Sequence, residues 1–123
     1  MYAVDHFNKK KQTSKEIINL NLVNKKLIFN FFKNKKIDYI FHLASISDID
    51  YSVKYPKKTL QNNINSLLNI LELAVVKKIK RIIFSSTIYA YSKQGSFYRI
   101  SKLTCEELLQ EYNRLYNLDF VVI

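Results

Sequence analysis

Two segments decide the fold of this chain and direct its chemistry: RIIFSST at residues 81–87 and YRISK at residues 98–102. The first is an apolar run that ends in hydroxyl side chains, which predicts a buried strand with Thr87 at its tip. The second opens an amphipathic stretch and places Tyr98 and Lys102 four residues apart, so both side chains lie on one face of the predicted helix. A hydroxyl at a strand tip beside a Tyr–Lys pair is a candidate catalytic group.

Apolar strands and amphipathic helices alternate on both sides of these segments. Strands are predicted over residues 2–5, 16–22, 38–44, 80–87 and 119–123, and helices over residues 24–35, 57–78 and 98–116. The polar residues 6–15 are expected to connect the first two strands. Strands without polar alternation, separated by helices, predict an α/β fold with a parallel sheet covered on both faces.

The polar residues at the predicted strand ends mark the functional edge, because open parallel sheets bind ligands beyond the carboxyl ends of their strands. These residues are Asp5, Asn21, the segment 42–47 and the segment 85–87.

Length and composition indicate one globular domain. The chain has 123 residues, of which 48% are apolar, enough for a single core. Cys105 is the only cysteine, which excludes an intrachain disulfide or a thiolate metal cluster and fits a reducing cytoplasm. No apolar run approaches the roughly 18 residues of a membrane span, and no secretory leader is visible. We therefore expect a cytoplasmic protein with no metal and no membrane partner.

The net charge of +10 raises nucleic acid as a partner, but the charge is dispersed. Lysines supply 17 of the 20 basic residues and are scattered along the chain, and the arginines are only Arg81, Arg99 and Arg114. Arginine is the residue that reads phosphate and guanine bidentately. We therefore expect no nucleic-acid partner.

The Tyr–Lys pair and Thr87 together suit alcohol oxidation by a nicotinamide. A free tyrosine has a pKa of about 10, so it needs a nearby cation to act as a base at neutral pH. Lys102 would supply that cation and could also donate hydrogen bonds to ribose hydroxyls. Thr87 could hold the substrate hydroxyl whose proton Tyr98 removes while hydride leaves the carbon.

With these motifs in place, the chain resembles the extended short-chain dehydrogenase/reductase family, the NAD-dependent sugar epimerases and dehydratases of the UDP-glucose 4-epimerase type. The matching segments are DYIFHLAS (38–45), PKKTLQNNINSLLNILELA (56–74), KRIIFSSTIYAYS (80–92) and YRISKLTCEELL (98–109). The resemblance implies a partial Rossmann-like, doubly wound parallel sheet, an NAD cofactor and a nucleotide-sugar substrate. It also implies a homodimer through the two long helices.

The resemblance assigns roles to individual positions. Thr87, Tyr98 and Lys102 take the catalytic positions. Asp5 resembles the acid that accepts hydrogen bonds from the adenosine ribose, which favours NAD over NADP. The other cofactor-side residues that it implies are Asn21 and Leu22 at the adenine, Leu43, Ala44 and Ser45 along the pyrophosphate and ribose, Ser85 near the nicotinamide, and Asn62 or Asn63 behind the active site. His42 is expected to be a core histidine.

Three departures from the family pattern limit the expected activity. We expect the smaller C-terminal domain with which the family binds the nucleotide-sugar to be absent from residues 1–123. The chain has one glycine, Gly95, so it contains no glycine-rich dinucleotide loop, and we expect the first strand of the sheet to be missing with that loop. The loop between Thr87 and Tyr98 is also compact, with Gly95 as its expected turn residue. We therefore expect residues 1–123 to be a partial NAD-binding domain without a separate substrate domain, poorly active alone.

Three alternatives stay open on the sequence. The chain could be a reductase of a nucleotide-linked keto-sugar, which would use the same Thr, Tyr and Lys. It could be a binding module that kept the sheet and lost the chemistry. It could also be a small basic nucleic-acid binder that stacks bases on Tyr89, Tyr91 and Tyr98.

Overall fold

The computed structural model describes residues 2–5 and 17–123, and its elements alternate as the sequence predicts. In chain order they are β1 (Ala3–Asp5), β2 (Ile17–Asn19), α1 (Lys25–Phe32), β3 (Tyr39–His42), α2 (Ile49–Lys54), α3 (Pro56–Lys77), β4 (Arg81–Phe84), the 3-10 helix η1 (Ile88–Tyr91), α4 (Ser96–Tyr116) and β5 (Phe120–Val122). The expected connection at residues 6–15 lies outside the described residues. The short elements α2 and η1 were not predicted.

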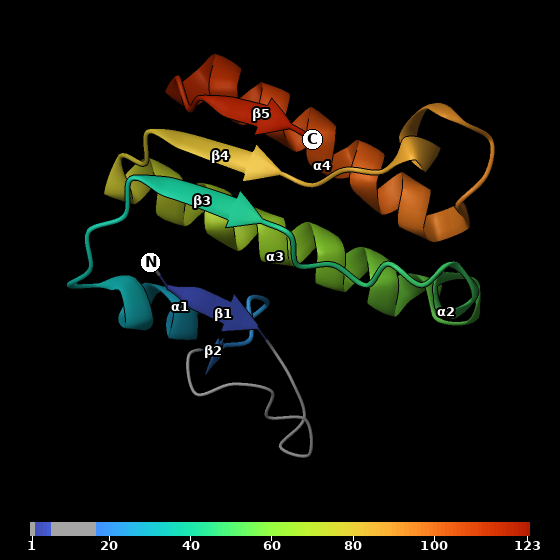
Figure 1. Cartoon of the computed structure of the whole chain (residues 1–123), viewed down its shortest axis with the longest axis horizontal. Coiled ribbons are helices and arrows are strands. Elements are labelled where there is room, and N and C mark those ends of the chain that lie inside the picture. Colours follow the sequence, from blue (N-terminus) through green and yellow to red (C-terminus); the bar gives the residue numbers. More distant parts are fainter. Residues whose placement is uncertain (1, 6–16) are drawn as a thin grey trace.

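The strands form two parallel sheets. One contains β1 and β2, and the other has the order β3-β4-β5. β1 lies beyond the β3 edge of the larger sheet and runs in the same direction as β3 (Figure 1). In the described ranges no strand pairs with both β1 and β3. The described strands therefore form two separate sheets and not one continuous sheet.

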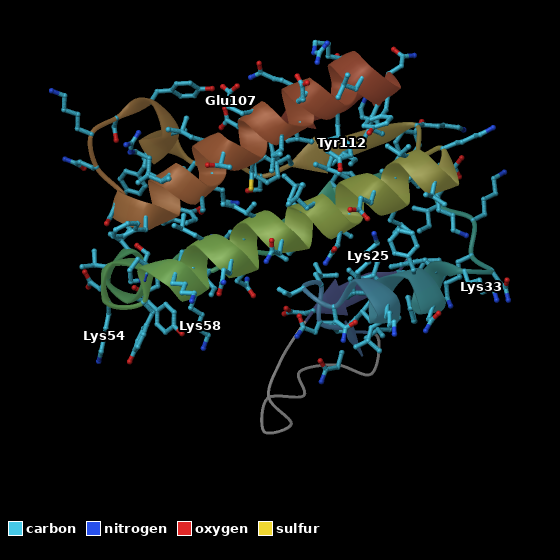
Figure 2. All side chains as sticks on the ribbon, turned by 180° about the vertical axis from the view of Figure 1, so that it is seen from behind. Lys25, Lys33, Lys54, Lys58, Glu107 and Tyr112 are labelled. Carbon is cyan, nitrogen blue, oxygen red and sulfur yellow. The ribbon has the colours of Figure 1, made fainter. Side chains whose placement is uncertain are left out.

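The core lies between the larger sheet and the two long helices. α3 and α4 pack side by side on one face of β3-β4-β5 (Figures 1 and 2). The side chains that fill this layer are fully or almost fully buried: Leu67, Ile70, Leu71, Leu73, Ile82, Phe84, Cys105 and Leu109. The apolar residues whose spacing predicted α3 and α4 are therefore largely the residues that these helices bury.

Among residues 2–5 and 17–123, helices pack on only one face of the larger sheet, and the cover expected on its opposite face is not seen there. Tyr39 and Phe41 project from β3 on that side, and Phe41 is 67% exposed. No helix among the described residues covers them. The reason is topological: the strands follow one another in one direction across the sheet, and right-handed crossovers then place both connecting helices on the same face.

Helix caps explain where the helices begin. Asn24 caps α1, because its side chain accepts from the Leu27 amide. Pro56 occupies the first turn of α3, where its missing N–H costs nothing. Gly95 precedes α4 with φ of 90°, and a Cβ there would lie 2.7 Å from the Cβ of Tyr89. The predicted turn role of Gly95 is therefore confirmed.

The region of β1, β2 and α1 is joined to the rest of the chain largely through α3. Asn69 of α3 donates to the carbonyls of Leu22 and Val23, at 2.9 and 3.0 Å. An exposed ion pair joins Lys25 to Glu72 of the same helix. These contacts set the position of β1 and β2 beside the larger sheet. In the described part of the chain, no helix is both long and apolar enough to cross a membrane.

Candidate active site and cofactor pocket

Lys102 is buried at the carboxyl end of β4. It lies in the second turn of α4, is 2% exposed, and donates from Nζ to the carbonyl of Ser85 at 2.6 Å. The ammonium lies 4.7 Å from the ring centroid of Phe84 and 5.7 Å from that of Tyr98. Burial lowers the pKa of Lys102, although the neighbouring Cys105 and Glu106 raise it in part. A cation held beside a phenol ring at a strand end is the arrangement that the sequence predicts.

Thr87 and Tyr98, the other two candidate catalytic residues, both precede this lysine in the chain. Tyr98 is buried in the first turn of α4. Thr87 lies two residues beyond the carbonyl that Lys102 holds, and its Oγ1 accepts from the Tyr89 amide at 3.3 Å, capping η1. A hydroxyl that accepts in a cap can still donate its proton. The fold therefore places Ser85, Thr87, Tyr98 and Lys102 at one end of β4.

Asn63 connects this group to the segment that follows β3. Its Oδ1 accepts from the Ile46 amide at 2.7 Å, and its Nδ2 donates to the Ile46 carbonyl at 3.0 Å and to Ser101 Oγ at 2.9 Å. Ser101 Oγ in turn donates to the Tyr98 carbonyl at 2.6 Å. Of the two asparagines that the sequence left open, Asn63 is the buried one behind the site, and Asn62 faces the pocket described below.

His42 and Cys105 complete the buried surroundings of Lys102. His42 is buried and stacks on Phe84, with ring centroids 6.0 Å apart and ring planes 10° apart. Burial, with a smaller contribution from the charge of Lys102, lowers the pKa of His42 to about 4, so the ring is neutral at pH 7. Burial raises the pKa of the Cys105 thiol to about 11. His42 is therefore the core histidine that the sequence predicts, and Cys105 is an inert buried thiol.

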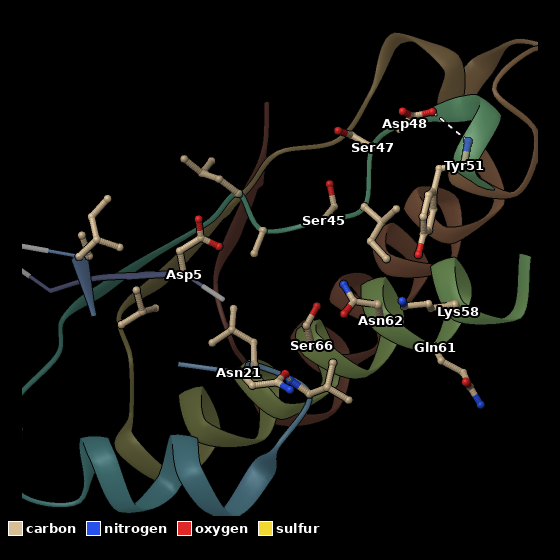
Figure 3. Close-up of a pocket in the computed structure, with 18 residues that line it drawn as sticks. Asp5, Asn21, Ser45, Ser47, Asp48, Tyr51, Lys58, Gln61, Asn62 and Ser66 are labelled. Atoms are coloured by element: carbon tan, nitrogen blue, oxygen red, sulfur yellow. Dashed lines mark hydrogen bonds between the residues drawn. The ribbon is translucent and has the colours of Figure 1, made fainter. Parts of the chain in front are cut away.

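A hollow of about 1070 Å³ opens beside this group, between the smaller sheet, the segment after β3 and helix α3. In Figure 3, Asn62 and Ser66 rise from α3 into the hollow, and Asp5, Asn21 and Ser45 lie around it. Seven of the residues predicted to bind the cofactor line it: Asp5, Asn21, Leu22, Leu43, Ala44, Ser45 and Asn62. The predicted residues Ser85, Tyr98 and Lys102 are not among its lining residues and belong to the group at the end of β4.

The pocket suits the nucleoside parts of a dinucleotide better than its phosphates. Its size is in the range of sites for drug-sized ligands. Asp5 and Asn21 bring acceptor oxygens for hydroxyl or amino groups, and Leu22 and Leu43 bring apolar surface. A glycine turn that would cradle phosphates is not part of this pocket, because the single glycine of the chain opens α4.

Several polar residues near the site were not singled out from the sequence. Ser101 and Glu106 are buried in α4 together with Lys102, and Lys58 and Tyr51 line the pocket. The helical period could have pointed to Ser101 and Glu106. Both residues share the apolar face of α4 with Cys105 and Leu109. A buried polar residue on such a face needs a hydrogen-bond partner, and the partners of Ser101 and Glu106 lie at the candidate site.

Comparisons with known proteins agree with this geometry. A model of the NAD dependent epimerase/dehydratase family matches residues 1–123. UDP-glucose 4-epimerase of Lacticaseibacillus casei is 31% identical over 105 residues, which are 75% of this chain and 32% of that protein. dTDP-D-glucose 4,6-dehydratase of Dictyostelium discoideum is 28% identical over 126 residues, covering 83% of this chain and 29% of that protein. This chain thus spans about a third of the length of these curated relatives.

Solved structures show the same fold. UDP-glucose 4-epimerase of Thermotoga maritima, solved with UDP-glucose, matches with a TM-score of 0.87 and 25% identity over 97% of this chain and 45% of that one. The UDP-glucose 4-epimerase of Brucella ovis, solved in complex with NAD, shares the fold with a TM-score of 0.79 and 20% identity over 87% of this chain and 37% of that one. The chain belongs to the NAD-dependent epimerase/dehydratase family.

Proposed function

We propose that this chain is the catalytic region of an NAD-dependent nucleotide-sugar epimerase or dehydratase, in which a sugar carbon is oxidised transiently. One observation carries the proposal. The ammonium of Lys102 is buried at the end of β4, where the Ser85 carbonyl holds it beside the ring of Tyr98. Burying a cation is costly, and the site retains one next to a phenol.

The three catalytic residues have separate tasks in this proposal. Thr87 orients the sugar hydroxyl, and Tyr98 accepts its proton as the carbon loses hydride. Lys102 supplies positive charge beside Tyr98 and hydrogen bonds to ribose hydroxyls. NAD, when bound, supplies the hydride acceptor. Return of the hydride to the opposite face of the carbon, and of the proton from Tyr98 to the oxygen, would complete an epimerisation.

The hollow beside this group is the proposed cofactor site. Asp5 accepts from the adenosine ribose and disfavours a 2′-phosphate through its charge, so NAD is preferred over NADP. Asn21 and Leu22 face the adenine, Leu43, Ala44 and Ser45 run along the rest of the cofactor, and Asn62 and Ser85 complete its side of the site. This assignment is supported by the seven predicted residues that line one hollow.

We propose further that residues 1–123 form a partial domain with weak cofactor binding, because the chain has a single glycine and that glycine opens α4. Titration of the ¹⁵N-labelled chain should show NAD binding in the millimolar range, with amide shifts at Asp5 and at residues 43–45, and weaker binding of NADP. Asp5→Asn should reduce the preference for NAD, whereas the exposed Asp50→Asn on α2 should not. Shifts confined to other surfaces, or equal binding of NADP, would contradict the cofactor assignment.

Turnover tests the catalytic assignment. The chain alone should not epimerise UDP-glucose, and efficient turnover would contradict the partial-domain proposal. A chimera can test the residues themselves: residues 80–116 replace the matching segment of the Lacticaseibacillus casei epimerase. Tyr98→Phe in this chimera should lower kcat by about a hundredfold or more, the usual contribution of a general base. Tyr89→Phe is the matched control and should leave kcat close to that of the parent chimera.

We also propose a homodimer through the outer sides of α3 and α4, in a cytoplasmic protein. The two helices lie side by side with one broad side away from the sheet (Figure 2). Ile100 of α4 is 41% exposed. Sedimentation equilibrium should give twice the chain mass, and Ile100→Asp should shift the equilibrium toward monomer.

A further inference from the structure

A buried carboxylate, Glu106, contacts both ends of the segment that contains Thr87. Its Oε1 accepts a hydrogen bond from Ser86 Oγ, and its Oε2 accepts one from Tyr91 Oη at 2.8 Å. Ser86 directly precedes Thr87, and Tyr91 is the last residue of η1, which Thr87 caps. Glu106 is only 6% exposed, whereas Tyr91 is 85% exposed and reaches the carboxylate with its hydroxyl alone.

Lys102 holds the same segment one helical turn earlier. It donates to the Ser85 carbonyl at 2.6 Å, and residues four apart on a helix lie on the same face. Residues 85, 86 and 91 are thus tied to adjacent turns of α4 by two side chains of opposite charge. Thr87 lies between these attachment points.

The charge of Glu106 also raises the pKa values of Tyr91 and Lys102. Its hydrogen bond raises the pKa of the Tyr91 phenol, with a smaller contribution from Glu107. Burial lowers the pKa of Lys102, and the Glu106 carboxylate opposes this by raising it. Glu106 therefore favours the charged form of the amine. Each oxygen of the buried carboxylate accepts a hydrogen bond from one hydroxyl group, which offsets the cost of burying the charge.

We propose that Glu106 is the positioning residue of this site: its carboxylate holds residues 86–91 against α4 and thereby fixes Thr87 relative to Lys102. Its relevance to catalysis rests on the proposed function, whereas the attachment itself does not. The test therefore uses the purified chain without cofactor or substrate, so that failure of the proposed enzyme activity leaves the result interpretable.

Two NMR readouts report on the segment. The first is hydrogen exchange at the Ala90 amide, which donates to the Thr87 carbonyl at 3.0 Å. The second is the chemical shift of the Thr87 methyl group. Glu106→Ala should speed exchange at Ala90 about tenfold, the change that corresponds to about one lost hydrogen bond, and should move the Thr87 methyl signal. Glu106→Gln should restore most of both values, since its amide can pair with the same two hydroxyls after they rotate.

Glu107→Ala is the matched control, because Glu107 is the next residue of α4 and is exposed. It should leave both readouts unchanged. If Glu106→Ala does not fold, the exposed Tyr91→Phe removes one of the two hydrogen bonds and should speed Ala90 exchange severalfold. Unchanged readouts in Glu106→Ala, or in Tyr91→Phe where that variant replaces it, would overturn the proposal. So would a loss of protection spread evenly over α3 and α4, which would indicate a general stabilising role.

Discussion

The two halves of the molecule treat polar side chains differently. The larger C-terminal part, residues 38–123, contains every buried polar or charged side chain of the described residues: His42, Ser52, Thr59, Asn63, Ser66, Ser101, Lys102 and Glu106. The N-terminal half, residues 2–5 and 17–37, buries only apolar side chains, and its polar residues Asp5 and Asn21 line an open hollow. The candidate catalytic residues Tyr98 and Lys102 are therefore part of a core, whereas Asp5 and Asn21 border a cavity.

This difference indicates that the two regions differ in local stability. In the C-terminal part, the side chains of Asn63, Lys102 and Glu106 are fixed by partners on other elements, which holds a site in position before any ligand arrives. The N-terminal half is fixed mainly by its contacts with α3, so its local stability should be lower. The following predictions test that contrast.

The largest effect is expected at Asn63. Asn63→Ala would leave the amide and carbonyl of Ile46 without their side-chain partner and would remove a hydrogen bond to Ser101. Unsatisfied buried groups are costly, so the free energy of unfolding should fall by about 3 kcal/mol, measured by urea denaturation. The neighbouring Asn62 lines the pocket and makes one long hydrogen bond to Asn63 Oδ1, at 3.5 Å. Asn62→Ala should therefore cost much less, about 0.5 kcal/mol. Equal losses in the two variants would contradict the distinction between buried core and open pocket.

A pH effect of about 2 kcal/mol is expected from His42. Its pKa is lowered to about 4 in the folded chain, from 6.5 in the unfolded chain. The unfolded state therefore binds more protons between these values, and stability falls as pH decreases from 7 to 5, by about 2 kcal/mol. Urea denaturation at both pH values measures the change.

His42→Gln should remove this part of the pH dependence, whatever its effect on absolute stability. Other titrating groups are the same in both proteins, so their contributions cancel in the comparison. A variant with the same slope as the parent chain would show that His42 is not held neutral.

The junction between the halves should respond locally to Asn69. Asn69→Ala removes two hydrogen bonds, to the carbonyls of Leu22 and Val23, and should cost about 1 kcal/mol. Because these bonds join the N-terminal half to α3, hydrogen exchange should accelerate in α1 and not in α4. The exposed Asn65→Ala on the same helix is the control. Acceleration of equal size in both helices would contradict a separate stability of the N-terminal half.

The sequence predicted the elements that carry strong periodicity or a cap. α1, α3 and α4 followed from their amphipathic patterns, and the turn before α4 from Gly95. α2 was missed although Asp48 caps it, because a helix of six residues shows too little periodicity. The open sheet face was missed because strand patterns do not show on which side the crossovers pass.

The candidate site was predicted where residues stand at strand ends, and missed where a polar residue lies within a helix stripe. Asp5, Asn21 and Ser45 were found by their position after apolar runs, and they line one hollow. Ser101 and Glu106 look like ordinary members of an amphipathic helix in the sequence. Their roles depend on partners 15 to 38 residues away, which only the packing of α4 against β4 and α3 brings close.

The smallest effect is expected from the ion pair between Lys25 and Glu72, which also joins the two halves. Both side chains are substantially exposed, at 57% and 40%, so solvent screens their attraction. Glu72→Gln should therefore lower the free energy of unfolding by less than about 0.5 kcal/mol, and the difference should vanish as salt is added. The loss caused by Asn69→Ala, by contrast, should be insensitive to salt, because an amide paired with carbonyls carries no net charge. Urea denaturation of both variants at low and high salt therefore separates the two kinds of junction contact. A larger loss of unfolding free energy in Glu72→Gln, dependent on salt, would contradict this prediction. It would show that the ion pair, and not the amide of Asn69, holds the N-terminal half on α3.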